Sequence, residues 1–170
     1  MSEGRRVIVG IDPGTAILGY GVVIADGDSL RAVCYGALTT RSSTPLSGRL
    51  LLLFDGLNDI LDRTSPTEAA VEQLFFARNV QSALAVGQAR GVAVLAAARH
   101  GLPVSEYTPQ QVKQAVAGYG RATKEQVQNM VRVMLGLEEI PQPDDAADAL
   151  AIAICHARWN ESMGYGRVSL

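Results

Sequence analysis

Two acidic residues each close a short apolar run, a placement that suits metal-ion chemistry. Asp12 follows Val7 to Ile11 and precedes a proline–glycine turn, and Glu72 follows Ala69 to Val71. A carboxylate at the end of a buried strand is held by rigid backbone yet faces the sheet edge, where a metal ligand must lie. Asp12 alone could equally cap the turn, and Glu72 alone is more typical of a surface residue. If the two strands are neighbours, their acidic ends lie close together.

A second acidic pair, Asp145 and Asp148, opens the last predicted helix. Residues three apart on a helix project from one face, so both carboxylates point the same way. Acidic residues in a first turn also cap exposed N–H groups and suit the helix dipole, and we assign Asp144 to that role as the N-cap. For Asp145 and Asp148, the small alanines around them are expected to leave room for an ion and a phosphate.

Four carboxylates that converge from two strands and a helix would repel one another unless divalent cations neutralised them. Hard oxygen ligands select Mg²⁺, with Mn²⁺ as a substitute. In two-metal phosphoryl transfer one ion activates water and the other stabilises the leaving oxygen. The residues Asp12, Glu72, Asp145 and Asp148 therefore predict hydrolysis of phosphodiester bonds with two ions per subunit.

The elements that must position these residues follow from apolar periodicity and turn residues. Strands are predicted at Val7–Ile11, Gly19–Ala25, Leu30–Leu38, Ala69–Glu72 and Pro103–Glu106. Helices are predicted at Leu46–Leu61, Asn79–His100, Pro109–Ala117, Thr123–Leu135 and Asp144–Trp159. The order βββαβαβααα, with a meander first, predicts an α/β fold with a mixed sheet flanked by helices on both faces. The ribonuclease H-like fold has this order.

Composition indicates one domain over residues 1–170, with a short polar and basic tail from about 160. The N-terminus has no apolar signal region, and the longest apolar stretch, Val92 to Ala98, is too short to span a bilayer. We therefore expect a cytoplasmic protein without a membrane partner. Cys34 and Cys155 lie far apart in the sequence and outside any metal-ligand spacing, so both are interpreted as buried thiols.

The net charge of −2 at first argues against a nucleic-acid partner, but the charge is unevenly distributed. The segment from Gln73 to Met134 carries a net +5 and the remainder −7. A basic segment beside acid-rich elements suits a protein that holds a polyanion next to a carboxylate metal site. Exposed helices that simply carry arginines would give the same pattern, so charge alone leaves both interpretations open.

Five motifs in order along the chain resemble the bacterial RuvC Holliday junction resolvases. The residues that carry the resemblance are Gly10 to Thr15 with Gly19 to Gly21, Glu72 to Phe75, Gly87 to Gly91, Gln111 to Gln114, and Asp145 to Ala151. The resemblance runs from about Val7 to His156. It implies a ribonuclease H-like endonuclease for recombination and repair that acts on four-way DNA junctions. It also implies a homodimer, Mg²⁺ dependence, paired nicks in strands of like polarity, and the branch-migration partners RuvA and RuvB.

Carried over residue by residue, the resemblance makes Asp12, Glu72, Asp145 and Asp148 the catalytic and metal-binding carboxylates. Some relatives have His at the Asp145 position, which changes the charge of that ligand. The family's base-stacking aromatic falls on Phe75 and its DNA-contacting lysines on Lys113 and Lys124. Two adjacent aromatics are more often core residues, so we place Phe76 in the core and Phe75 outside, where it can stack on a base. Arg78 and Arg121 are further candidate DNA contacts in the basic segment.

The predicted helix from Asn79 to His100 has Gly87 and Gly91 four residues apart, a spacing that lets another helix come close. In the resolvase family a helix of this region contributes to the dimer contact. Close packing on the protein's own sheet would use the same glycines.

Two rival functions remain at this stage. Asp12 to Thr15 with Gly19 to Gly21 also resembles the phosphate-binding hairpin of actin-like ATPases, which predicts a nucleotide-binding module. Those proteins need two such lobes, and this chain has no second glycine-rich phosphate loop. A non-catalytic DNA-binding protein is the other alternative, and the presence of all four carboxylates argues against it.

Overall fold

The computed structural model describes residues 4–73 and 79–162, with side chains described as far as residue 159. Its strands are β1 (Arg6–Asp12), β2 (Ile17–Asp26), β3 (Ser29–Thr39), β4 (Glu68–Glu72) and β5 (Val104–Tyr107). Its helices are α1 (Leu46–Thr64), α2 (Val80–Arg99), α3 (Pro109–Ala117), α4 (Lys124–Met134) and α5 (Asp144–Ser162). The predicted order of elements is confirmed, with ends that differ by a few residues.

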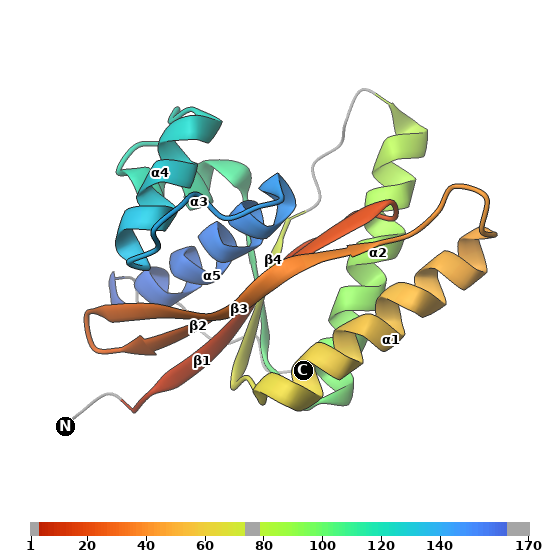
Figure 1. The fold of residues 1–170 in the computed structure, drawn as a ribbon, viewed down its shortest axis with the longest axis horizontal. Helices are drawn as coiled ribbons and strands as arrows, with labels where there is room; N and C mark the ends of the chain where they lie inside the picture. The colour runs from red at the N-terminus through yellow and green to blue at the C-terminus, as the bar shows by residue number, and fades with distance from the viewer. Residues whose placement is uncertain (1–3, 74–78, 163–170) are drawn as a thin grey trace.

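The five strands form one mixed sheet in the order β3-β2-β1-β4-β5 (Figure 1). The first three strands are an antiparallel meander, while β4 and β5 run parallel to β1. Parallel neighbours present their carboxyl ends at the same edge of a sheet. The ends of β1 and β4, where Asp12 and Glu72 stand, therefore meet.

Helices cover both faces of the sheet (Figure 1). On one face α1 and α2 pack against Val9, Ile11 and Val71. On the other face α5 packs against Ile8 and Ala70, and α3 and α4 pack on α5. Successive strand residues point to opposite faces, so Asp12 and Glu72 lie on the same face as Ile8 and Ala70. Both carboxylates thus face the layer that contains α5.

Glycines on β1 and β2 let α5 lie directly on the sheet. A Cβ at Gly10 would stand 2.0 Å from the carbonyl oxygen of Ala149, and one at Gly19 would stand 2.0 Å from that of Asp145. Ala146 and Ala149 are fully buried in this contact. The expectation that these alanines leave room for an ion is therefore wrong, because their small size lets the helix backbone approach the strands.

Helix α2 is long and apolar enough to cross a membrane on length and composition alone. Core helices of soluble proteins pass the same test, so this is weak evidence for a membrane span. Here the face of α2 that carries Ala89, Ala93 and Ala97 is buried against the sheet. Its alanine content is explained by this packing.

Candidate metal centre

Asp12 and Glu72 are brought together by the pairing of β1 with β4. The last registered pair in this ladder is Ile11 with Val71, so the two acidic residues follow side by side. Both side chains are half-buried, and a hydrogen bond joins their carboxyl groups. Such a bond requires one of the two groups to be protonated.

Asp145 and Asp148 approach the same point from the start of α5. Gly19 pairs with Asp12 across β1 and β2, and the backbone of Asp145 lies against Gly19. The charges of Asp145 and Asp148 act on Asp12, and that of Asp148 acts also on Glu72. The structure therefore gathers the four predicted carboxylates at one edge of the sheet.

The pKa values of three carboxyl groups in this cluster are raised, because the groups are buried and negative charges lie close together. Burial, followed by repulsion from Glu72, Asp148 and Asp145, raises the pKa of Asp12 to about 8. Burial also raises the pKa of Glu72, and the charge of Asp148 adds to this effect. Burial raises the pKa of Asp148 in spite of the neighbouring Lys124. A divalent cation would relieve this repulsion, and the all-oxygen donor set suits Mg²⁺ or Mn²⁺.

The types of ligand at this site suit such an ion, but the side chains are not arranged around a common point. Within residues 4–73 and 79–162, no three carboxylate, imidazole or thiol groups lie close enough together to share one ion. Asp12 and Glu72 bond to each other, and Asp148 pairs with Lys124. An ion would bind here only if these contacts opened and the carboxylates turned toward a common centre.

Two lysines stand beside the carboxylates. The Nζ atom of Lys124 lies 3.3 Å from Asp144 Oδ2 and 3.4 Å from Asp148 Oδ2. Burial lowers the pKa of Lys124, but the charges of Asp148 and Asp144 outweigh it and raise the pKa overall. Burial raises the pKa of Glu72, and the charges of Lys113 and Lys124 oppose that rise, so both lysines act at this site. Both residues were predicted as DNA contacts, and that role remains a prediction.

The N-cap assignment of Asp144 is wrong. Helix α5 begins at Asp144, and the N–H of Ala146 donates to the carbonyl of Pro143, which occupies the cap position. The Asp144 side chain instead accepts from Gln128 at 3.2 Å and pairs with Lys124. Asp144 therefore fixes the start of α5 against α4.

The remaining predicted DNA contacts either lie apart from this cluster or fall outside the residues that the structure describes. Arg121 is exposed in the turn between α3 and α4, two residues before the N-cap Thr123. Phe75 and Arg78 lie outside the described residues, as does Phe76, for which a core position was predicted.

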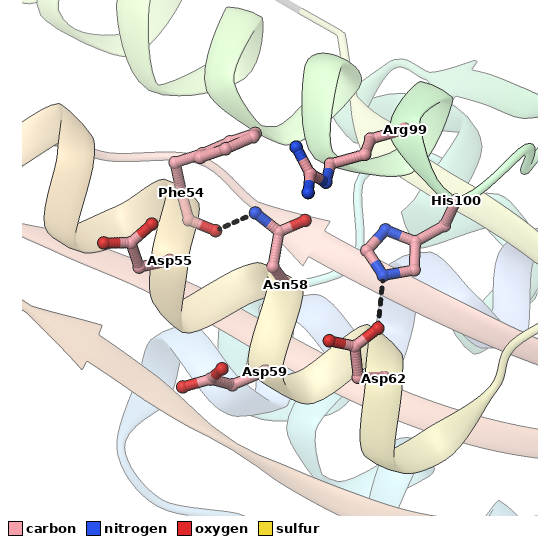
Figure 2. Close-up of a pocket in the computed structure, with 7 residues that line it drawn as sticks. All are labelled: Phe54, Asp55, Asn58, Asp59, Asp62, Arg99 and His100. Atoms are coloured by element: carbon pink, nitrogen blue, oxygen red, sulfur yellow. Dashed lines mark hydrogen bonds and ion pairs between the residues drawn. The ribbon is translucent and has the colours of Figure 1, made fainter.

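A separate pocket of about 340 Å³ lies between α1 and the end of α2 (Figure 2). Its lining is Phe54, Asp55, Asn58, Asp59, Asp62, Arg99 and His100. Figure 2 shows the hydrogen bond of 2.9 Å between His100 Nε2 and Asp62 Oδ1. The pocket belongs to the layer of α1 and α2, on the other face of the sheet from the carboxylate cluster. None of the predicted site residues that the structure describes lines it.

Sequence reasoning missed the glycines that serve the site through packing. A Cβ at Gly21 would meet Leu150 side-chain atoms at 2.7 Å, and one at Gly19 would meet the Asp145 backbone. The Gly19 to Gly21 motif, which had suggested a phosphate-binding hairpin, is therefore covered by α5. The nucleotide-binding alternative is not favoured. Gly19 and Gly21 are two residues apart on one strand, so they lie on the same face of the sheet. This spacing was the signal in the sequence that a helix packs closely there.

A mixed sheet of this topology, with acidic residues at the ends of β1 and β4 and at the start of α5, defines a nuclease of the ribonuclease H-like class. Residues 8–156 match the family model for "Crossover junction endodeoxyribonuclease RuvC". The chain belongs to this family.

Relatives of known sequence and structure agree with that membership. The RuvC of Chloroflexus aggregans is 63% identical over 149 residues, which span 88% of this chain and 91% of the relative. That of Desulforamulus reducens is 56% identical over 162 residues, which span 95% and 99% respectively. The structure of T. thermophilus RuvC in complex with a Holliday junction substrate superposes with a TM-score of 0.87 at 42% identity, covering 91% of this chain and 94% of that one. The function of this chain is accordingly that of a DNA endonuclease that resolves Holliday junctions in recombination and repair.

Proposed function

We propose that Asp12, Glu72, Asp145 and Asp148 hold two Mg²⁺ ions per subunit, for which Mn²⁺ can substitute, and that this centre cuts the junction strands. The observation that supports this is the convergence of four half-buried carboxylates, with the pKa of Asp12 raised to about 8 by burial and mutual repulsion. Bound ions would supply an activated water and stabilise the leaving oxygen. The role of the carboxylates is to hold that charge at the sheet edge.

Residues around the cluster are proposed to bind the DNA backbone. Lys124 is exposed and spans Asp144 and Asp148, so its ammonium can turn from these carboxylates to a phosphate that approaches the site. Lys113 is half-buried and close enough for its charge to act on Glu72, so it too can meet a phosphate that approaches the site. Phe75 is proposed to stack on an unpaired base, and Arg78 and Arg121 to contact phosphates.

A homodimer is proposed because resolution requires two nicks, and residues 4–73 and 79–162 of one chain form one such carboxylate cluster. Helix α2 presents exposed apolar side chains along its outer face, with Val80 72%, Leu84 61% and Leu95 59% exposed. Gly91 lies between the two leucines, and a Cβ there would meet nothing within 4 Å. This face suits close packing against the α2 helix of a second copy. RuvA and RuvB are the proposed branch-migration partners, and the cytoplasm the proposed location.

A synthetic mobile four-way junction tests the metal assignment. Incubated with Mg²⁺, the protein should give paired nicks in strands of like polarity, and EDTA should abolish them. Asp12→Asn in the same reaction should bind the junction but leave it uncut, because the amide keeps the shape and removes the anionic ligand. Full cleavage by Asp12→Asn in Mg²⁺ would remove that residue from the proposed site.

A further inference from the structure

A second polar cluster lies on the same face of the sheet as the carboxylates. Arg6 donates to Glu68 from Nε at 2.6 Å and from Nη2 at 3.1 Å. Glu68 Oε2 lies 2.6 Å from His156 Nε2, and His156 Nδ1 lies 2.8 Å from the Tyr107 hydroxyl. Each nitrogen of the imidazole therefore has one hydrogen-bond partner. The four side chains form one hydrogen-bonded chain.

The inner half of this chain is buried. His156 is 2% exposed and Tyr107 5%, and His156 is the one fully buried polar side chain of those assigned to the core within the described residues. An unbonded imidazole there would cost free energy, and both of its nitrogens are satisfied. Well-packed apolar residues could fill the same space at similar stability. The directional bonds therefore fix the relative positions of their partners, which apolar packing would not do.

Three members of the cluster stand on the elements that carry the four carboxylates, away from the carboxylates along each element, and Tyr107 stands on the neighbouring strand β5. Arg6 begins β1, which ends at Asp12, and Glu68 begins β4, which ends at Glu72. His156 lies on α5, eight residues beyond Asp148. Tyr107 ends β5, and its carbonyl accepts from the N–H of Gln73, directly after Glu72.

Along β4 and along α5, the distance from the network to the carboxylate cluster is about the same. Glu68 to Glu72 spans four strand residues, about 13 Å at roughly 3.3 Å per residue. Asp148 to His156 spans eight helical residues, about 12 Å at roughly 1.5 Å per residue. A bond from His156 to Glu68 at one end therefore holds Asp148 level with Glu72 at the other. If α5 slid along β4, the carboxylates would separate.

We propose that the network of Arg6, Glu68, His156 and Tyr107 fixes the axial position of α5 against β1 and β4, and thereby positions the four carboxylates for metal binding. These are positioning residues, since none of them belongs to the carboxylate cluster. The inference rests on the proposed metal assignment of Asp12, Glu72, Asp145 and Asp148. It adds a determinant of metal affinity that lies outside the carboxylate cluster.

The test is direct Mn²⁺ binding, measured without DNA by electron paramagnetic resonance. His156→Phe removes both hydrogen bonds and keeps an aromatic ring, and it should weaken Mn²⁺ binding about tenfold. Tyr107→Phe removes a single oxygen, so it should fold normally and weaken binding by about threefold. His156→Gln keeps a donor and an acceptor and should stay within about twofold of the parent protein. In single-turnover cleavage, the loss should shrink as Mn²⁺ approaches saturation, with junction affinity in Ca²⁺ unchanged.

Leu57→Ala is the matched control for stability. Leu57 belongs to α1 and is fully buried in the core on the other face of the sheet, so the variant should lower the melting temperature yet keep the parent Mn²⁺ affinity. Parent-like Mn²⁺ binding in both His156→Phe and Tyr107→Phe would overturn the proposal, as would an equal loss in Leu57→Ala. Should His156→Phe not fold, Tyr107→Phe decides alone. Asp12→Asn distinguishes a failure of this proposal from a failure of the metal assignment on which it rests. If the variant still binds Mn²⁺ and cuts, the metal assignment itself fails.

Discussion

The Nζ atom of Lys124 lies 3.4 Å from Oδ2 of Asp148, so a proposed phosphate ligand contacts a proposed metal ligand. A lysine in this place neutralises part of the carboxylate cluster. It must leave Asp148 before either residue can take up its proposed partner. Metal binding and DNA binding are therefore expected to depend on each other at this contact.

Replacing Lys124 by alanine should affect the two activities in opposite directions. Mn²⁺ binding without DNA should strengthen, because a competing cation is lost from beside Asp148. Junction binding should weaken, with the salt slope reduced in magnitude by about one unit, and the cleavage rate at saturating protein should fall. Affinities at several salt concentrations and single-turnover rates measure these effects. Lys113→Ala should share the change in salt slope, and an unchanged slope and rate in both variants would mean that the lysines do not hold phosphates.

Asp12→Asn should stabilise the fold while it abolishes cutting. The folded-state pKa of Asp12, about 8, lies above the ordinary value of 3.8, so ionisation costs stability as pH rises through this interval. An amide carries no such charge, so in EDTA at pH 8 the variant should melt higher by roughly 2–6 °C. Calorimetric melting checks this, with pH 4 as the internal control, where the difference should shrink. A lower melting temperature than the parent at pH 8 would contradict it.

Gly19→Ala should damage the site through the backbone of α5. The new methyl group would stand 2.0 Å from the Asp145 carbonyl oxygen, so the start of the helix must move. We expect a loss of about 1–3 kcal/mol of stability and a fall in cleavage rate of at least about tenfold. Gly36→Ala is the control, because the atoms nearest its methyl group belong to the ring and hydroxyl of Tyr20, which packs on the other face of the sheet. Equal cleavage rates in the two variants at equal stability would show that the Gly19 contact does not position Asp145.

Leu84→Asp should convert the proposed dimer to a monomer. An aspartate on the exposed face of α2 would place a charge in the proposed helix contact and leave it unpaired. Light scattering across a concentration series measures the mass, and junction assays should then show uncoupled single nicks. Val133→Asp, on the equally exposed face of α4, should leave the mass unchanged. A dimer that persists in Leu84→Asp would place the interface elsewhere.

Local patterns in the sequence were enough to predict most of the helices and strands. Apolar runs bounded by turn residues predicted the strands, and Thr123 with Gln126 forms a capping box that begins α4 close to the predicted residue. The convergence of Asp12 and Glu72 followed from one further assumption, that β1 and β4 are neighbours, which their pairing confirms. Parallel pairing across a crossover is the usual arrangement in such folds.

Contacts between distant residues could not be predicted in the same way. Glu68 begins a strand and looks like a surface residue, yet it bonds to His156, 88 positions later. No local pattern specifies that pairing, because it depends on how far α5 lies along β4. The alanines of α5 and Asp144 were misread for the same reason, since their roles are set by Gly10, Gly19 and Lys124 on other elements.

Glu68 should make the stability of the protein depend on acid pH. Burial raises its pKa, but hydrogen bonds from His156 and Arg6 outweigh that effect and lower the pKa to about 2, against an ordinary value of 4.5. A group whose folded pKa is lowered stabilises the fold above its unfolded pKa and loses that contribution as pH falls through the folded value. The contribution of Glu68, at most about 3 kcal/mol, should therefore be complete above pH 4.5 and disappear between 4.5 and 2.

Urea unfolding of the parent and of Glu68→Gln across pH 2 to 7 isolates this contribution. The glutamine variant keeps the shape and some hydrogen bonds but carries no charge, so it should be less stable at pH 7 and nearly equal to the parent at pH 2. The difference between the two curves cancels the other carboxylates, which titrate in both proteins. Asp62→Asn is the control, because Asp62 is 71% exposed and its pair with His100 is screened by solvent, so its curve should follow the parent within about 0.5 kcal/mol. A constant difference between parent and Glu68→Gln from pH 7 to pH 2 would show that the Glu68 charge does not stabilise the fold.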